Sequence, residues 1–468
     1  MFFDEDKLKE ECGVFGVLLK NNKIKDNKDL IYNALFSLQH RGEDGSGIYC
    51  YKNQNTNLYK ELGLVLNNLT KNNLNDFTCN MALAHNRYST CKIHQNFALQ
   101  PFFKKFEDQD LNIAIVHNGN LNLKKVFYDD LYEKKYEKYS DSNIFFDIFL
   151  KKLKIALKKY HIKNIKSKKS FKYIQEVLVG ALNYFNGSYS MIISINDMII
   201  AFRDKKGIRP LFLAENEQGY YLASETCALE DIDYKQLIEI RNNSIVFITD
   251  KVYKNNLYKE EFKERFCAFE YIYFQREDSM IDDKSIYNYR YDLGLKMAKK
   301  LNTMDIDIVS GVPMSGIPSA LAISNDLGIE YKDIFLKQRY KGRSFIKNSN
   351  EKIKTAINEK IKIIKDIVKN KNILIVDDSL VRGSTMNYIV KKLKEYGAKK
   401  IHIAITSPII KNPCYLGINI STKKELIGAK LSKDEIKNYL DIDSLNYLEV
   451  NDLKNTLKEN ICIDCFCN

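Results

Sequence analysis

The sequence predicts an α+β sandwich followed by a parallel α/β domain, and the order of its apolar runs separates the two. Up to about residue 250, short apolar and β-branched runs alternate with turns marked by Gly, Asn or Asp. From about residue 285 the order becomes helix, strand, helix, strand, and the apolar strands end in polar loops. A chain of 468 residues is long enough for two or three domains with separate cores.

In the first part, strands are expected over six runs: GVFGVLL, MALAHNRYS, LNIAIVHNG, SYSMIISIN, MIIAFRD and GYYLASE. Helices are expected at about 28 to 39, 140 to 160 and 172 to 185. This mixture favours sheets flanked by helices.

In the second part, the runs DIDIVSGVP, NILIVDDSL and KIHIAITSP predict parallel strands, and a helix is expected over residues 383–396. A parallel sheet binds its ligands at the carboxyl ends of the strands, so the polar loops there are the first place to look for chemistry.

Composition excludes several classes of protein. No apolar stretch reaches the roughly 18 to 20 residues that a membrane span needs, and Asn196 and Asp197 interrupt the closest one. The first ten residues are acidic and have no basic segment, so we expect a cytoplasmic protein without a membrane partner. The formal charge of +13 comes from lysines spread along the chain, and the densest block, residues 151–174, is typical of a solvated helix and loop. We therefore expect no nucleic-acid partner.

The stretch NILIVDDSLVRGST places two acids and an anion-binding loop after a strand. Asp377 and Asp378 can accept hydrogen bonds from ribose hydroxyls or bind Mg²⁺ through water. Hydroxyls, glycine amides and a helix N-terminus follow them and form a cradle for an anion: Ser379, Arg382, Gly383, Ser384 and Thr385. Two acids after a strand are also compatible with a capped structural loop.

The whole string resembles the phosphoribosyl-pyrophosphate (PRPP) signature of type I phosphoribosyltransferases. The resemblance implies that Asp377 and Asp378 hold the ribose hydroxyls and that residues 379–385 bind the 5-phosphate. GVPMSGIP (311–318) resembles the pyrophosphate loop, with Ser315 joining Asp377 and Asp378 around Mg²⁺, although Met314 stands where relatives commonly have Asp. KQRYKGRSFI (337–346) resembles the mobile loop that closes over PRPP through Lys337, Arg339 and Arg343.

The run EECGVFG at residues 10–16 places a cysteine near the start of the chain. Cys12 is either a small buried residue that opens a strand or a nucleophile that becomes N-terminal after cleavage. Joined to the PRPP signature, this start resembles the glutamine phosphoribosylpyrophosphate amidotransferases, whose motifs recur in order along the chain: LQHRGEDGSGI, HNRYST, HNGN, SDSN and CAFEYIYFQREDS. The resemblance implies an N-terminal-nucleophile (Ntn) hydrolase sandwich. It also implies a propeptide at 1–11, a glutaminase domain at 12–255 and a phosphoribosyltransferase domain at 256–468.

In that family, the first residue of the mature chain carries both the nucleophilic thiol and the basic amine. The resemblance assigns Cys12 as nucleophile, Arg87 as the clamp for the glutamine α-carboxylate and Asp141 as the partner of its α-ammonium. Asn118 and the backbone N–H of Gly119 are the expected oxyanion donors. His85 and His117 are interpreted as structural, and Glu43 departs from the usual glutamine of the QHRGQ motif.

Four further cysteines predict a metal group, because four thiolates hold either Zn²⁺ or an iron–sulfur cluster. They are Cys267, Cys414, Cys462 and Cys465. A single C-x-x-C pair slightly favours zinc, whereas the resemblance to the Bacillus-type branch of the family implies a structural [4Fe–4S] cluster, with Cys467 as a substitute ligand.

The resemblance therefore implies transfer of ammonia from glutamine to C1 of PRPP, giving 5-phosphoribosylamine, glutamate and pyrophosphate in the first committed step of purine (IMP) synthesis. It also implies a homo-oligomer, a dimer or tetramer, inhibited by purine nucleotides. Three alternatives stay open. They are a PRPP-binding regulatory protein, an ammonia-using enzyme with an inactive glutaminase site, and a sugar or asparagine type of amidotransferase. The PRPP loop argues against the last.

Overall fold

The computed structural model describes residues 12–69, 77–88, 98–124, 139–301, 305–337, 361–418 and 422–467. These residues form two compact units, one built from 12–266 with Tyr415–Gly417 and the other from Cys267–Cys414 with the chain after 417. The division falls after Phe266 rather than after 255, because residues 256–265 are bonded to the first unit. Leu257 N donates to Asn243 O and Arg265 N donates to Lys206 O. Residues 1–11, the expected propeptide, lie outside the described residues.

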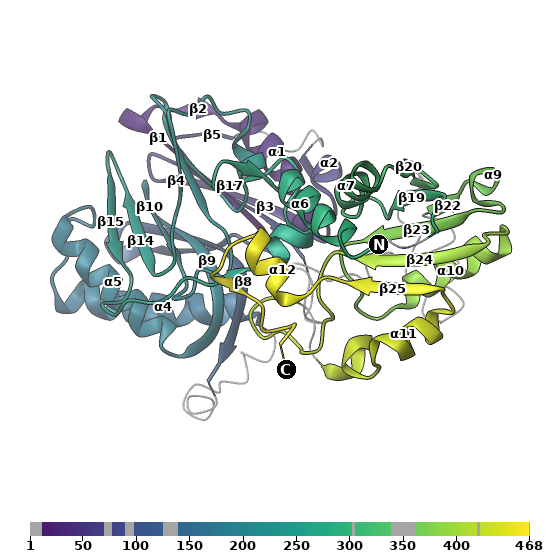
Figure 1. Ribbon diagram of the computed structural model, residues 1–468. Coiled ribbons are helices and arrows are strands. Elements are labelled where there is room, and N and C mark those ends of the chain that lie inside the picture. Colours follow the sequence, from purple (N-terminus) through teal and green to yellow (C-terminus); the bar gives the residue numbers. More distant parts are fainter. Residues whose placement is uncertain are drawn as a thin grey trace. The chain divides into compact units, whose positions relative to one another are not determined.

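The first unit contains two antiparallel sheets (Figure 1). The seven-stranded sheet runs in the order β13 (Gln236–Glu239), β11 (Phe212–Glu215), β12 (Gly219–Ala223), β1 (Gly13–Leu19), β6 (Met81–Arg87), β3 (Gly45–Lys52), β4 (Asn55–Leu62). The six-stranded sheet runs β15 (Val252–Asn256), β14 (Ser244–Ile248), β10 (Met198–Arg203), β9 (Phe185–Ile195), β8 (Leu111–Leu123), β7 (Phe102–Phe106). A short pair, β2 (Lys25–Asp26) and β5 (Thr78–Cys79), stands apart.

A core of alternate strand residues joins the two sheets face to face. Val14, Leu83, Val116 and Ile192 all belong to it and have no exposed surface. Because successive strand residues point to opposite faces, the neighbours Ile115 and Ile193 face the other side of the six-stranded sheet. The expected sandwich is thus confirmed.

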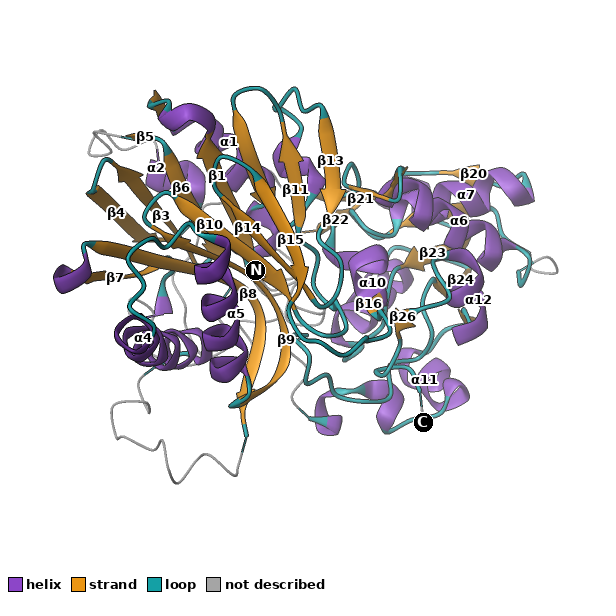
Figure 2. Ribbon diagram, turned by 90° about the vertical axis from the view of Figure 1, so that its left-hand side faces the viewer, coloured by secondary structure: helices purple, strands orange, loops and turns teal. Residues whose placement is uncertain are grey.

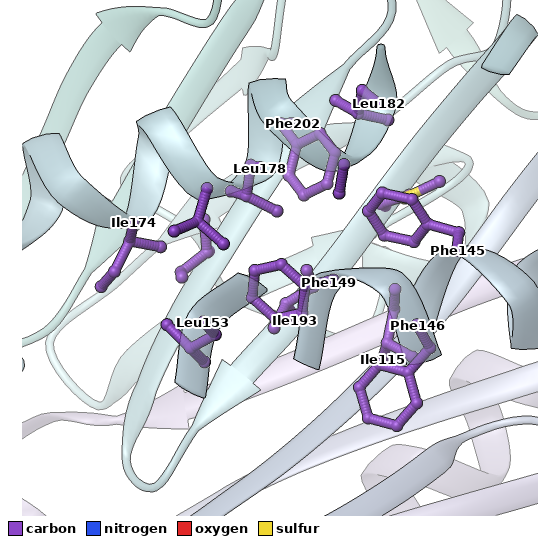
Figure 3. Close-up of a cluster of buried hydrophobic side chains, with 14 of the residues drawn as sticks. Ile115, Phe145, Phe146, Phe149, Leu153, Ile174, Leu178, Leu182, Ile193 and Phe202 are labelled. Carbon is purple, nitrogen blue, oxygen red and sulfur yellow. The ribbon is translucent and has the colours of Figure 1, made fainter. Parts of the chain in front are cut away.

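Two helices, α4 (Asp141–Lys159) and α5 (Lys168–Leu182), cover that other side. Figure 3 shows Phe145, Phe149 and Leu178 among the side chains that pack from these helices onto Ile115, Ile193 and Phe202. The lysine-rich block at 151–174 therefore contains the apolar faces of two amphipathic helices. On the seven-stranded sheet, α1 (Lys28–Ser37) packs against β1 and β6, with α2 (Val65–Leu69) beside it.

The second unit contains the expected parallel sheet, in the order β20 (Glu330–Tyr331), β19 (Ile308–Gly311), β23 (Asn372–Asp377), β24 (Lys400–Ile405), β25 (Ser444–Tyr447). Ile373, Ile375 and Ile403 face the helices α10 (Ser384–Glu395) and α11 (Lys433–Leu440). On the other face α7 (Ile317–Leu327) packs on β19 and β23, and α6 (Ile286–Ala298) packs on α7 (Figure 2).

The smaller elements described in this unit include three strand pairs and two short α-helices. The pairs are β16 (Phe266–Cys267) with β26 (Ile461–Cys462), β17 (Met280–Ile281) with β18 (Lys284–Ser285), and β21 (Phe335–Lys337) with β22 (Ile361–Ile363). The helices are α9 (Lys365–Val368) and α12 (Val450–Thr456). Within the described ranges, no helix combines the length and apolar character needed to cross a bilayer.

Candidate functional site

Cys12 and Arg87 meet at one end of the seven-stranded sheet. Gly13 of β1 pairs with Asn86 of β6, and the antiparallel register brings the next residues, Cys12 and Arg87, to the same end. The Cys12 Sγ lies 4.0 Å from the carbonyl O of Tyr88, which follows Arg87 directly. Cys12 and Arg87 are 8% and 5% exposed, so both candidate residues are buried.

Asn118 and Gly119, the expected oxyanion donors, lie on β8 in the six-stranded sheet. Gly119 has φ +142°, and a Cβ there would stand 2.2 Å from Ser188 O, so no other residue fits without moving the strand. Asn118 is fully buried, its Nδ2 donates to Ser224 Oγ at 3.4 Å, and its Oδ1 has no hydrogen-bond partner.

The Oδ1 and Nδ2 atoms of the Asn118 amide have nearly the same shape, so a flip of the side chain exchanges them. The flipped orientation fits the expected role as an oxyanion donor. Ser224 Oγ already accepts a hydrogen bond from Val14 N at 3.0 Å, so its own proton is available to donate to an amide oxygen. With Oδ1 turned toward Ser224, the Asn118 NH₂ becomes the donor at the orphaned position. That is the group an oxyanion needs.

Asp141 is the first residue of α4 and is tied to β8. Its Oδ2 accepts from Leu121 N at 2.8 Å and its Oδ1 accepts from Ser142 N at 2.7 Å. The first contact connects the Asp141 carboxylate to the strand that carries Asn118 and Gly119, two residues beyond Gly119. Asp141 Oδ1 also accepts from the Ser142 hydroxyl at 3.2 Å, so Oδ2 is the oxygen that keeps a second lone pair for an ammonium ligand.

The two histidines of the site are buried between these elements. Burial, and secondarily the charge of Arg87, lowers the pKa of His85 to about 3. Burial also lowers the pKa of His117, against an opposing effect of the Asp141 carboxylate, and His117 Nδ1 lies 2.7 Å from Ser142 Oγ. Both imidazoles are neutral at pH 7, as the structural interpretation requires.

Sequence reasoning missed a buried ion pair behind Cys12. Arg41 Nε donates to the carbonyl O of Cys12 at 3.3 Å, and Arg41 Nη1 donates to Glu225 Oε1 at 2.5 Å. Arg41 lies in the quoted LQHRGEDGSGI motif, which marked the segment as important but not the residue. No sequence signal singles out Glu225, which stands 184 positions further along the chain.

The second unit brings together the candidate PRPP residues at the carboxyl edge of its sheet. Gly311 of β19 pairs with Val376 of β23, so the loops after these strands are adjacent. Ser315 Oγ donates to Asp378 Oδ1 at 2.8 Å, and Ser379 Oγ donates to Asp378 Oδ2 at 2.9 Å. Asp377 Oδ1 accepts from Asp378 N at 2.9 Å, and both carboxylates are buried. The two loops therefore form one oxygen-lined site.

The rest of the phosphate loop leads into α10 as expected. Gly383 has φ +81° and directly precedes the helix, with Ser384 and Thr385 as its first residues. Arg382 forms an ion pair with Glu425, a partner that the sequence did not indicate. Lys337 ends β21, whereas Arg339 and Arg343 lie outside the described residues.

The four cysteines predicted to hold a metal or a cluster all belong to the second unit. The β16–β26 pairing joins the segments that hold Cys267 and Cys462, and Lys411 N and Asn412 N both donate to Cys465 O. The pKa of the Cys465 thiol is raised by its burial and then by the proximity of Cys267, Cys414 and Cys462. None of the four cysteines is in a disulfide, and over the described ranges no three His, Cys, Asp or Glu side chains are arranged to hold one metal ion.

Comparison with known proteins identifies both domains. Residues 85–231 match a glutamine amidotransferase domain and residues 288–416 a phosphoribosyl transferase domain. The amidophosphoribosyltransferase of Synechocystis sp. is 35% identical over 98% of this chain and 91% of its own length. That of Methanocaldococcus jannaschii is 34% identical over 97% and 96%. The fold matches the solved "glutamine phosphoribosylpyrophosphate (PRPP) amidotransferase from B. subtilis complexed with ADP and GMP" with a TM-score of 0.82 and 29% identity, covering 97% of this chain and 96% of that one. The chain belongs to the amidophosphoribosyltransferase family.

Proposed function

We propose that this protein transfers ammonia from glutamine to C1 of PRPP, giving 5-phosphoribosylamine, glutamate and pyrophosphate, the first step of purine synthesis. The observation that carries the proposal is that one chain holds candidate residues for both reactions. Cys12, Arg87 and Asn118 lie in a glutaminase fold, while Ser315 and Asp378 join two phosphate loops on a parallel sheet.

In the glutaminase reaction, removal of residues 1–11 leaves Cys12 with a free α-amine. Such an amine titrates near pH 7.7 to 8.0, so it takes the thiol proton without a catalytic histidine. The sulfur attacks the side-chain amide carbon, and the oxyanion is held by Asn118 and Gly119 N–H. The protonated amine then gives its proton to the departing ammonia, and water hydrolyses the thioester to glutamate.

Arg87 and Asp141 select glutamine by its charged end. A guanidinium matches the α-carboxylate in a two-bond geometry, and the Asp141 carboxylate accepts from the α-ammonium. The connection from Asp141 to Leu121 N aligns this end of the substrate with the oxyanion donors on β8.

In the synthase reaction, the ammonia nitrogen attacks C1 of PRPP and pyrophosphate leaves. Asp377 and Asp378 hold the ribose hydroxyls, and the loop 379–385 binds the 5-phosphate through its hydroxyls and the N-terminus of α10. The donor set of two carboxylates and a hydroxyl suits Mg²⁺, which commonly takes one or two carboxylates plus substrate phosphates. When bound, Mg²⁺ offsets the charge of the leaving pyrophosphate.

We further propose that Cys267, Cys414, Cys462 and Cys465 hold a structural [4Fe–4S] cluster, as in the Bacillus-type branch with a propeptide. The support is that the β16–β26 pairing and the bonds from Lys411 N and Asn412 N to Cys465 O bring together the three segments that carry these cysteines. Protein purified without oxygen should contain iron and acid-labile sulfide in equal amounts. Zinc in their place would contradict the cluster. The variant C465S should lose both elements, whereas C50S, in β3 of the other unit, should keep them.

Regulation, assembly and location belong to the same proposal. Because the B. subtilis enzyme was solved with ADP and GMP, we expect purine nucleotides to inhibit this protein. We also expect a cytoplasmic homo-oligomer, which light scattering of the purified protein tests.

The first experiment is glutamate release from glutamine, with Mg²⁺, in the presence and absence of PRPP. Strong stimulation by PRPP supports two communicating sites. No release, with ammonia-dependent synthesis retained, would indicate an inactive glutaminase. The absence of both reactions would favour a PRPP-binding regulatory protein.

A further inference from the structure

A fully buried charged group stands behind the candidate nucleophile. Arg41 ends the turn η2 (Gln39–Arg41), and Glu225 directly precedes the turn η7 (Thr226–Leu229). Their ion pair, Nη1 to Oε1 at 2.5 Å, has no exposed side-chain surface on either residue. His40 Nε2 lies 2.8 Å from the same Glu225 oxygen and is partly exposed. A guanidinium and an imidazole thus converge on one buried carboxylate.

The Arg41 guanidinium also bonds to Cys12, through its Nε–H group. Arg41 Nε donates to the Cys12 carbonyl O at 3.3 Å. Because the guanidinium is planar and rigid, the carboxylate that holds Nη1 also determines where Nε points.

The residue beside Glu225 holds the other side of the reaction centre. Ser224 N donates to Val14 O, and Ser224 Oγ accepts from Val14 N at 3.0 Å. The same hydroxyl lies 3.4 Å from the Asn118 amide. The short segment Ser224–Glu225 therefore contacts both the chain that carries the nucleophile and the expected oxyanion donor.

The carboxyl group of Glu225 is ionised in the folded protein. Burial alone would raise the pKa of its carboxyl, but the charges of His40 and Arg41 and their hydrogen bonds lower that pKa far below the ordinary range. The carboxylate is ionised at any pH where the enzyme works. Replacing it with a neutral group leaves Arg41 buried without its counter-charge, and the guanidinium then shifts toward other acceptors or water.

We propose that Glu225 is a positioning residue of the glutaminase site, which acts through Arg41 on Cys12 and through Ser224 on Asn118. The inference rests on the proposed glutaminase function. Glu225 lies behind Cys12 and needs no contact with glutamine, so its loss should affect the rate of the chemical step more than the binding of substrate.

The test compares E225Q with the wild type and with E217Q. Glu217 is a matched control, because it also forms an ion pair in the same unit, with Lys235, but its side chain is 80% exposed. Sites with a reactive Cys12 are counted by labelling with an electrophilic glutamine analogue, and kcat is expressed per labelled site. We expect E225Q to lower kcat for glutamate release by about 10- to 100-fold, because a 1 Å misplacement of reacting groups has effects of that size. The KM for glutamine should stay within about threefold, since the residues that clamp its charged end are unchanged.

The double variant R41Q/E225Q separates positioning from simple charge balance. It removes both charges of the Arg41–Glu225 pair together, so it avoids the buried charge imbalance that E225Q alone creates in that pair. A positioning role predicts that its kcat stays low, because the guanidinium bond to Cys12 O is missing. A kcat per labelled site equal to that of the wild type, in either variant, would overturn the inference. If the wild type itself released no glutamate while ammonia-dependent synthesis persisted, the proposed glutaminase would have failed instead.

Discussion

Gly119→Ala is the substitution whose effect follows most directly from the structure. A methyl group at this position would stand 2.2 Å from Ser188 O and 2.9 Å from the Tyr189 Cα, both backbone atoms of the paired strand β9. Carbon and oxygen atoms prefer separations above 3 Å, so β8 and β9 must move apart by about 1 Å. The backbone φ of +142° adds strain for any side chain.

The movement displaces the N–H that is expected to bind the oxyanion. One oxyanion donor contributes about 10²- to 10³-fold to kcat, and a 1 Å misplacement has a similar effect. We therefore expect glutamate release by G119A to fall by at least about 100-fold. Ammonia-dependent synthesis of phosphoribosylamine should stay near the wild-type rate, because it uses residues of the other unit.

The matched control is Gly180→Ala. Gly180 lies within the helix α5, and a methyl group there would meet only the Lys152 side chain, at 3.7 Å or more. This change should leave both reactions unchanged and stabilise the protein by about 0.5 to 1 kcal/mol. If folded G119A released glutamate at the wild-type rate, the assignment of Asn118 and Gly119 on β8 as the oxyanion donors would be refuted.

Three other predictions concern the nucleophile, the PRPP loop and a buried histidine. Cys12→Ala should abolish glutamate release and keep ammonia-dependent synthesis, and mass spectrometry of the wild type should find Cys12 at the N-terminus; a mature chain that retains Met1 would contradict the mechanism. Asp378→Asn should reduce ammonia-dependent synthesis by about 100-fold or more, because it removes a charge that Ser315 and Ser379 hold in place; unaffected kinetics in PRPP would count against the assignment. His85 has a folded pKa of about 3, below its unfolded value of about 6.5, so the unfolded state binds the proton first. The contribution of neutral His85 to the free energy of unfolding should therefore be complete above pH 6.5 and should be lost progressively as the pH falls toward 3. In urea titrations at pH 7 and pH 5, His85→Gln should lose less stability between the two pH values than the wild type does. Equal losses in both proteins would refute the burial argument.

Most of the secondary structure that positions the two sites was predictable. The strand before Asp377 and the helix after Gly383 follow from a run of apolar residues and a glycine, both of which act over a few neighbouring residues. Helix α5 begins at Lys168 rather than near 172, because the Ser167 hydroxyl caps it by accepting from Ser170 N. That cap was available in the sequence but lies within a lysine-rich stretch that hides the amphipathic pattern.

The sequence by itself determined the chemical groups, namely a thiol near the start of the chain, two acids at the end of a strand and four further cysteines. These motifs are defined by residues close together in the sequence, so they can be recognised without knowledge of the fold. Only the tertiary structure decided which distant groups support them: Glu225 behind Arg41 and Cys12, Ser315 against Asp378, and Glu425 on Arg382. These contacts depend on sheet register and loop placement, which are set by the packing of the whole unit. They therefore cannot be predicted from the residues that neighbour each side chain in the sequence.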